Sequence, residues 1–423
     1  MKIMKRVALL GLSVLLVSCG GGGGSVPTPP TPGGSNPPPA LNIVKIGAVG
    51  ANNFLRTAAN AQGDVIAVWR TFTDDPIRVT ESEIWANVYH PVTGWGAAQK
   101  VQSLAVPYVV EVAMDNHGDA VVVWMENLAN PITTALKTAA YVAGVWQSPQ
   151  VLDHDPVCVP QVSADPSGAT VAQVMWCVAD EVRSSGYRVT GGSSVPTVVP
   201  LALPGTPSGS LGQITFGIDA GGAVQVVAET SFDLRAVRGV AGVWGPVSVV
   251  QSFGRVAGIR NPYLAVGVNG HAVAAWQEQV ATGVQVWVAY YDGVMWQPPV
   301  LLEDSAVVFQ NELQVEVGSD GAAVLVWGST HAGRYRGGVW DTAVLAASAP
   351  PHLAMNANND VRVVWAAGAG EIWSRHFSGA QPWSAPVQLT DPRTSNPLVE
   401  LAPDGKPLLV WADETGVWSL ITP

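Results

Sequence analysis

The feature that most constrains this chain is a short pattern that recurs along most of its length. Each copy has a turn, usually Asp or Asn followed by Gly, and then an apolar run that ends in Trp, as in DNHGDAVVVW. Copies lie 38 to 55 residues apart, a period typical of solenoids, propellers and arrays. Seven copies end at Trp69, Trp124, Trp176, Trp276, Trp327, Trp365 and Trp411, and a degenerate eighth copy ends at Ala228.

Each copy predicts four short strands. A strand often led by proline enters the turn, where Asp or Asn bonds its own backbone and Gly supplies a positive φ. The Val- and Ala-rich run after the turn suits a strand buried on both faces. A third and a fourth strand follow, and no helical period occurs after residue 40. Four antiparallel strands per repeat make the blade of a β-propeller. We therefore predict an all-β propeller over residues 41–423 with eight four-stranded blades, or seven if the degenerate fourth copy does not form one.

The ends of the chain predict how this ring closes. The eighth copy supplies three strands, at residues 397–402, 407–412 and 416–421, and then the sequence stops. The missing fourth strand is predicted at residues 41–46, where LNIVKI follows a run of prolines. Donating that strand would remove an exposed sheet edge.

All 17 tryptophans fall on three positions of the repeat. Large aromatic residues at fixed strand positions are expected to fill the space between neighbouring sheets. The alternative is a lectin-like stacking platform, and it applies mainly to the fourth-strand set, which lies nearer the loops. The third-strand residues are Trp85, Trp287, Trp373 and Trp418, and the fourth-strand residues are Trp95, Trp146, Trp244, Trp296, Trp340 and Trp383.

The N-terminus predicts export. Lys2, Lys5 and Arg6 precede an apolar stretch of eleven residues at 7–17, which is too short to span a bilayer core that needs about 20. Small residues then lead to Cys19, as in a removable signal. We predict a signal peptide at residues 1–18. Residues 20–40 are rich in Gly and Pro, and at about 3.1 Å per residue they would form a tether of roughly 65 Å.

The quartet Leu16-Val17-Ser18-Cys19 resembles the lipobox of bacterial lipoproteins. The resemblance implies a diacylglycerol on Cys19 as the membrane anchor, with Gly20 favouring the outer membrane, on its periplasmic face or at the cell surface. Segment 19–40 is then a lipidated tether and 41–423 the propeller domain. The body resembles the propeller-repeat lipoproteins of bacteria and, more loosely, the sialidase-like propellers. The Asp-box of sialidases is absent, so no catalytic residue is carried over.

Composition limits the partners. Removing the signal peptide removes three of 21 basic residues and no acid, so the mature charge is 18 − 32 = −14. Phosphate backbones repel such a protein, and nucleic acid is excluded as a partner. The other two cysteines, Cys158 and Cys177, lie in adjacent predicted strands on either side of a turn. Outside the cytoplasm a disulfide between them would persist, and two small buried thiols are the alternative.

The usual catalytic motifs are missing, and the seven histidines are scattered. We predict no catalytic residue, no metal ligand and no cofactor. One charge pattern recurs: carboxylates follow the second strand in six of eight copies. They are predicted to form an acidic rim at the channel mouth that binds a cation or a basic partner, or else a solvated rim that aids solubility. Its members are Asp75, Glu126, Asp180, Glu229, Glu278 and Asp413.

These features together predict a monomeric, lipid-anchored extracytoplasmic binding module that presents propeller loops to a protein or glycan. Two alternatives have the same fold: a glycan-active hydrolase or lyase with a site over the channel, and a scaffold subunit of an envelope assembly complex. The fold by itself does not choose among them.

Overall fold

The computed structural model describes residues 42–48, 55–72, 82–104, 107–129, 132–201, 211–253, 258–281, 283–305, 313–328, 331–345, 350–367, 371–379, 381–390, 397–413 and 415–421. The signal peptide, Cys19 and the tether lie outside these residues, as does Asp75. The sheets all belong to one compact unit, Leu41–Pro423. No helix in the described ranges has the length and hydrophobicity that a membrane crossing requires.

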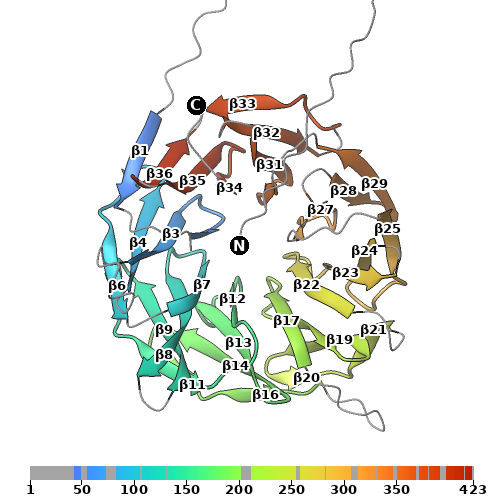
Figure 1. Ribbon diagram of the computed structural model, residues 1–423, viewed down its shortest axis with the longest axis horizontal. Helices are drawn as coiled ribbons and strands as arrows, with labels where there is room; N and C mark the ends of the chain where they lie inside the picture. Colours follow the sequence, from blue (N-terminus) through green and yellow to red (C-terminus); the bar gives the residue numbers. More distant parts are fainter. Residues whose placement is uncertain are drawn as a thin grey trace, which may run out of the picture. The chain divides into compact units, whose positions relative to one another are not determined.

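The described residues form eight antiparallel sheets arranged in a ring, with one strand of each sheet facing the centre (Figure 1). The innermost strands are β2 (Arg56–Ala59), β7 (Pro107–Met114), β12 (Gln161–Ala164), β17 (Leu211–Ile218), β22 (Gly258–Val266), β26 (Gln314–Val317), β30 (His352–Met355) and β34 (Leu398–Leu401). The second strands are β3 (Val65–Phe72), β8 (Ala120–Ala129), β13 (Ala172–Val178), β18 (Val224–Thr230), β23 (Ala272–Val280), β27 (Ala323–Trp327), β31 (Asp360–Ala367) and β35 (Pro407–Asp413).

The third and outer strands complete each sheet. The third strands are β4 (Ser82–His90), β9 (Ile132–Val142), β14 (Glu181–Arg188), β19 (Asp233–Val240), β24 (Gly283–Tyr291), β28 (His331–Arg336), β32 (Glu371–Ser378) and β36 (Gly416–Ile421). The outer strand is split in blades 1 to 4, as β5 (Gly94–Trp95) with β6 (Gln99–Leu104), β10 (Val145–Trp146) with β11 (Gln150–His154), β15 (Gly192–Ser193) with β16 (Thr197–Val199), and β20 (Val243–Trp244) with β21 (Ser248–Ser252). Blades 5 to 7 use β25 (Val300–Ser305), β29 (Val339–Val344) and β33 (Val387–Thr390).

The fold is therefore an eight-bladed propeller, as the repeat predicted, and the seven-bladed alternative is wrong. The eighth blade is closed by the N-terminal strand β1 (Asn42–Gly47), which pairs antiparallel with β36. Asn42 lies opposite Ile421, and Lys45 lies opposite Trp418. The closing strand was predicted at residues 41–46, one residue from its observed position.

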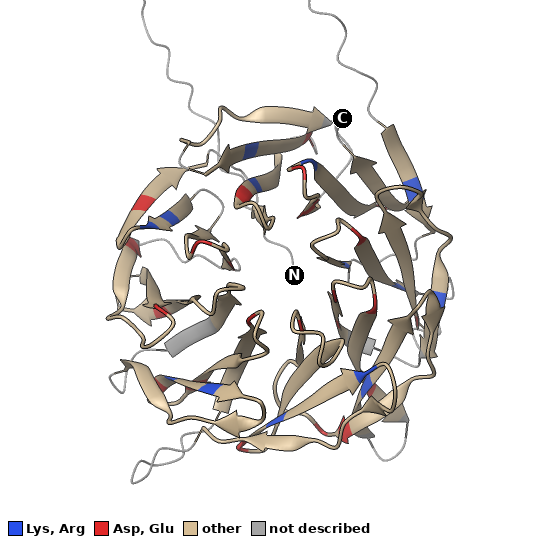
Figure 2. Ribbon diagram, turned by 180° about the vertical axis from the view of Figure 1, so that it is seen from behind, with Lys and Arg blue, Asp and Glu red and all other residues tan. Residues whose placement is uncertain are grey.

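The turn between the first two strands of blade 2 shows how the repeat fixes local structure. The Asp115 carboxylate accepts the backbone N–H groups of His117 at 2.8 Å and Asp119 at 3.0 Å. Gly118 has a φ of 81°, which other residues adopt only at a cost. Adjacent turns are also joined, because the Asn60 side chain donates to the Asp115 carbonyl at 3.1 Å. Figure 2 shows Asp and Glu positions on loops near the central opening. Turn carboxylates such as Asp115 and Asp219 accept backbone N–H groups.

The second-strand tryptophans fill the seams between blades, as predicted. All seven are at most 3% exposed. Trp124 shares one core cluster with Ile66 and Val68 of the preceding blade. Fourth-strand tryptophans are half-buried and pack against the core clusters: Trp95 contacts Tyr89 and Trp146 contacts Tyr141, with ring centroids 5.5 and 5.3 Å apart. These contacts fit the packing interpretation, and one side of each ring remains accessible.

The residue opposite each second-strand tryptophan follows a rule. In four blades it is a third-strand Trp, as in Trp69 opposite Trp85. In the other Trp-containing blades it is a basic residue, as in Trp124 opposite Lys137. In blade 4, where Ala228 replaces the Trp, Arg235 lies opposite it and is 3% exposed. Its guanidinium donates to Asp233 at 2.7 Å and to the Leu201 carbonyl at 3.1 Å, so the polar group is compensated.

Blade 3 carries a disulfide. The sulfurs of Cys158 and Cys177 are bonded, with Cα atoms 5.3 Å apart. Cys177 belongs to β13, and Cys158 lies just before β12, so the bond links the start of an inner strand to the buried second strand. Both residues are buried. The structure therefore has the disulfide, and the alternative prediction of two free thiols is wrong.

Candidate functional site

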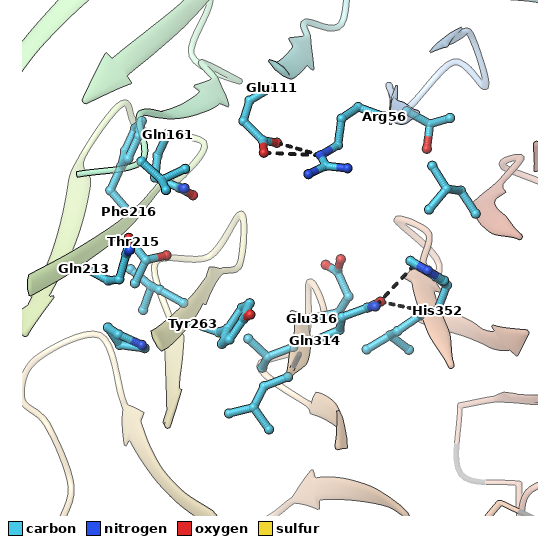
Figure 3. Close-up of a pocket in the computed structure, with 18 of the residues that line it drawn as sticks. Arg56, Glu111, Gln161, Gln213, Thr215, Phe216, Tyr263, Gln314, Glu316 and His352 are labelled. Carbon is cyan, nitrogen blue, oxygen red and sulfur yellow. Dashed lines mark hydrogen bonds and ion pairs between the residues drawn. The ribbon is translucent and has the colours of Figure 1, made fainter. Parts of the chain in front are cut away.

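The ring encloses a cavity of about 640 Å³ on its central axis. Residues from the innermost strand of every blade line it (Figure 3). A pocket that takes a few polar groups from each of several elements is the usual form of a ligand site. The central channel is therefore the candidate site.

One position of the repeat supplies a lining residue from every blade. It lies four residues before the first residue of the turn, for example Glu111 before Asp115 and Gln161 before Asp165. We call these side chains the channel ring; they are Arg56, Glu111, Gln161, Thr215, Tyr263, Gln314, His352 and Leu398. Seven of the eight carry a polar group.

The position two residues further along is small in six blades. It is Ala, Ser or Gly at residues 58, 113, 163, 217, 265 and 354. In blades 6 and 8 it is Glu316 and Glu400, and both line the cavity. Glu316 and Glu400 are therefore the two large, acidic side chains at a position that is otherwise occupied by a small residue.

Two members of the channel ring neutralise one another. The Arg56 Nε lies 3.2 Å and 3.3 Å from the two carboxylate oxygens of Glu111, so the pair is bidentate at one nitrogen. Arg56 Nη1 also donates to the Leu55 carbonyl at 3.1 Å. Such a charge-assisted pair fixes both side chains in the wall between blades 1 and 2.

Gln314 and His352 form a second contact between neighbouring inner strands. Gln314 Oε1 accepts the Leu353 backbone N–H at 2.8 Å, and its Nε2 donates to the Pro351 carbonyl at 3.1 Å. The same Nε2 lies 3.3 Å from His352 Nδ1. Burial, together with the nearby positive charge of Arg56, lowers the pKa of His352 to about 4. The imidazole is therefore neutral at pH 7 and adds no positive charge to the channel.

Glu316 and Glu400 have raised pKa values. Burial, and secondarily the charge of Glu400, raises the pKa of Glu316 to about 8. Burial raises the pKa of Glu400 to about 7, although the Thr57 hydroxyl donates to its Oε1 at 2.7 Å and opposes this shift. Desolvation disfavours the charged carboxylate, and a second carboxylate nearby adds to the effect. Near neutral pH the pair therefore holds at least one proton.

The predicted acidic rim lies elsewhere. Of its five described members, none lines the cavity. The Glu126 carboxylate pairs with Lys137 and accepts the Trp124 indole N–H at 3.3 Å. Asp413 accepts the backbone N–H groups of Thr415 and Gly416 at 2.7 and 3.1 Å, so it caps a turn. These two carboxylates are explained by local structure.

The other three members differ among themselves. Asp180 is exposed in the turn between β13 and β14. Burial raises the pKa of Glu229 and of Glu278, and the Gln213 backbone N–H donates to Glu229. Gln213 itself lines the cavity, so Glu229 lies just behind the wall. The structure does not bring these carboxylates together in one site. No group of three or more potential metal ligands occurs in the described part of the chain.

The motif search missed the residues that do line the cavity, including Arg56, Glu111, Glu316 and Glu400. Glu316 and Glu400 could have been found because they depart from the repeat: the other copies have Ala, Ser or Gly at this position. The recurring turn and Trp of the repeat are packing residues, so the recurring pattern does not mark the position of Glu316 and Glu400.

Comparison with known proteins identifies no family for this chain. Neither a family model nor a curated protein matches the sequence. Similar solved structures include a protein of unknown function from Dyadobacter fermentans, with 10% identity and a TM-score of 0.41 over 90% of this chain and 98% of that one. The BP39L lectin from Burkholderia pseudomallei has 13% identity and a TM-score of 0.43, over 71% and 95%. An α-L-arabinanase from Penicillium chrysogenum, complexed with arabinobiose, has 10% identity and a TM-score of 0.40, over 91% and 98%. Similarity at this level concerns the fold alone.

Proposed function

We propose that this protein is an extracytoplasmic binding module, held to the outer membrane by a lipid on Cys19, and that it binds a glycan in the central channel. The observation that carries the proposal is the channel ring, in which every blade contributes a side chain to one cavity and seven of the eight are polar. The signal peptide and lipobox support the anchor.

The chemistry of the wall suits a ligand rich in hydroxyl groups. Gln161, Gln213 and Thr215 lie together on one side of the cavity, with Tyr263 beside them (Figure 3). Amide and hydroxyl side chains both donate and accept hydrogen bonds, as sugar hydroxyls do. Phe216 and Leu264 add apolar surface to the same part of the wall. A few placed polar groups on a partly apolar wall fix the orientation of a small ligand.

The test is binding to an array of immobilised saccharides, followed by calorimetry with each saccharide that binds. A variant with Gln161→Ala and Gln213→Ala should bind at least about fivefold more weakly, because each lost hydrogen bond contributes about 0.5–1.5 kcal/mol. Its thermal midpoint should equal that of the wild type. Silence across the array, or equal binding by the variant, would contradict the proposal.

A glycan-active hydrolase or lyase is the second candidate, and Glu316 with Glu400 favours it. Carboxyl groups with pKa values of about 8 and 7 are suited to general acid and base catalysis near neutral pH. In this case the saccharides that bind would be cleaved on incubation, and Glu316→Gln would abolish cleavage while binding persists. If the saccharides remained intact after prolonged incubation, the enzyme candidate would be excluded and the binding-module proposal would remain.

A further inference from the structure

The charges of the cavity do not balance. Arg56 is the one Lys or Arg among the residues that line it, and it is already paired with Glu111 at 3.2 Å. The other basic group in the wall, His352, is neutral at pH 7. Glu316 and Glu400 are therefore left with no cation to offset them in the described lining.

Of the two carboxyl groups, that of Glu316 has fewer compensating contacts than that of Glu400. Its carboxyl group points into the cavity between Tyr263 and His352 (Figure 3). The side chain is half-buried, and no described residue gives it a hydrogen bond or an ion pair. Glu400 receives one neutral hydrogen bond, from Thr57. An enclosed carboxylate without a cation costs free energy, so a ligand that brings a positive charge would gain what the protein itself does not supply.

We propose that the cavity binds a glycan through a primary ammonium group on one of its sugars, and that Glu316 and Glu400 receive that group. The ligand class is thus an amino sugar without its N-acetyl group. This inference rests on the proposed glycan-binding function and narrows it. An ammonium group has three N–H donors, so it can bond a carboxylate and also neutral acceptors in the wall.

The same arrangement explains how the empty channel remains stable. Without ligand, a proton on the pair reduces the repulsion between Glu316 and Glu400. The ammonium group takes the place of that proton, so binding releases it to solvent. Affinity should therefore rise from pH 5 to pH 7 as the carboxyls ionise. The other charged and titratable groups facing the pair are Arg56, Glu111, Tyr263 and His352; His352 stays neutral over this range.

The experiment compares two trisaccharides of equal length, one of glucosamine and one of N-acetylglucosamine, by calorimetry at pH 7. Wild type should bind the glucosamine trisaccharide at least tenfold more tightly. A variant with Glu316→Gln and Glu400→Gln should lose this preference. Asp180→Asn is the matched control, because it removes an exposed carboxylate far from the lining and should keep the preference.

Equal affinity for both trisaccharides would overturn the inference and leave glycan binding in place. A preference that survives Glu316→Gln with Glu400→Gln would also overturn it, since the charge would then be recognised elsewhere. If neither trisaccharide binds while other saccharides on the array do, the ammonium inference fails alone. If no saccharide binds at all, the proposed function fails with it.

Discussion

The seams between the blades and the wall of the channel come from the same repeat, yet they differ in almost every respect. Each seam contains the same kinds of residue, with a Trp that is at most 3% exposed in seven of eight blades. The channel ring has seven different residue types at one position of eight blades, from Arg56 to Leu398. The seams must fill the same space eight times, so packing density constrains them. The wall borders a cavity, so its side chains are not constrained to fill one repeated space, and their variety fits the proposed ligand site.

The largest expected effect tests the seam. Trp124→Ala should lower the free energy of unfolding by about 3–5 kcal/mol, because it leaves a cavity between blades 1 and 2. Gln161→Ala in the wall should change it by less than about 0.5 kcal/mol. Urea denaturation of both variants measures the difference. Similar losses in the two would remove the distinction between seam and wall.

A smaller effect is expected where the wall is tied to the seam. The Cys158–Cys177 disulfide spans 19 residues, and a loop of this size predicts a loss of about 3 kcal/mol on its removal. Reduction of the wild type should therefore lower its urea midpoint. The double variant Cys158→Ala with Cys177→Ala should show a low midpoint that reductant does not change. An unchanged midpoint in reduced wild type would contradict the prediction.

The third prediction concerns a wall residue, Glu316, whose replacement should raise the free energy of unfolding instead of lowering it. The pKa of Glu316 is raised from 4.5 to about 8, so the folded protein holds a proton there that the unfolded chain releases. This contribution to stability is complete below pH 4.5 and is lost as the pH rises to about 8. Glu316→Gln has no such loss, so the stability of the variant relative to the wild type should rise by about 3 kcal/mol between pH 5 and pH 8.

Urea denaturation at pH 5 and pH 8 measures this gain. Asp180→Asn, which changes an exposed carboxyl group, should have the pH dependence of the wild type. If Glu316→Gln followed the wild-type dependence too, Glu316 would be an ordinary solvated carboxyl group and the case for an unbalanced cavity would weaken.

The contrast between seam and wall also explains how far the sequence could be interpreted. The turn at Asp115 and Gly118, the buried run that ends at Trp124, and the closing strand near Ile43 are each encoded within about ten residues, and repetition made them visible. The cysteines left two alternatives, because the approach of two sulfurs depends on strand register. The six acids after the second strand had a clear pattern, yet Lys137 neutralises Glu126 and backbone N–H groups bind Asp413.

The sequence by itself determined the propeller architecture, the four-stranded blade and the packing role of the second-strand tryptophans, because these depend on local periodicity that recurs along the chain; the structure decided between eight blades and seven. Only the tertiary structure decided which side chains share the cavity. Arg56 and Glu111 are 55 residues apart, and Thr57 and Glu400 are 343 apart. A closed ring brings together one residue from each distant copy, and the burial that raises the pKa of Glu316 exists only once all the blades surround it.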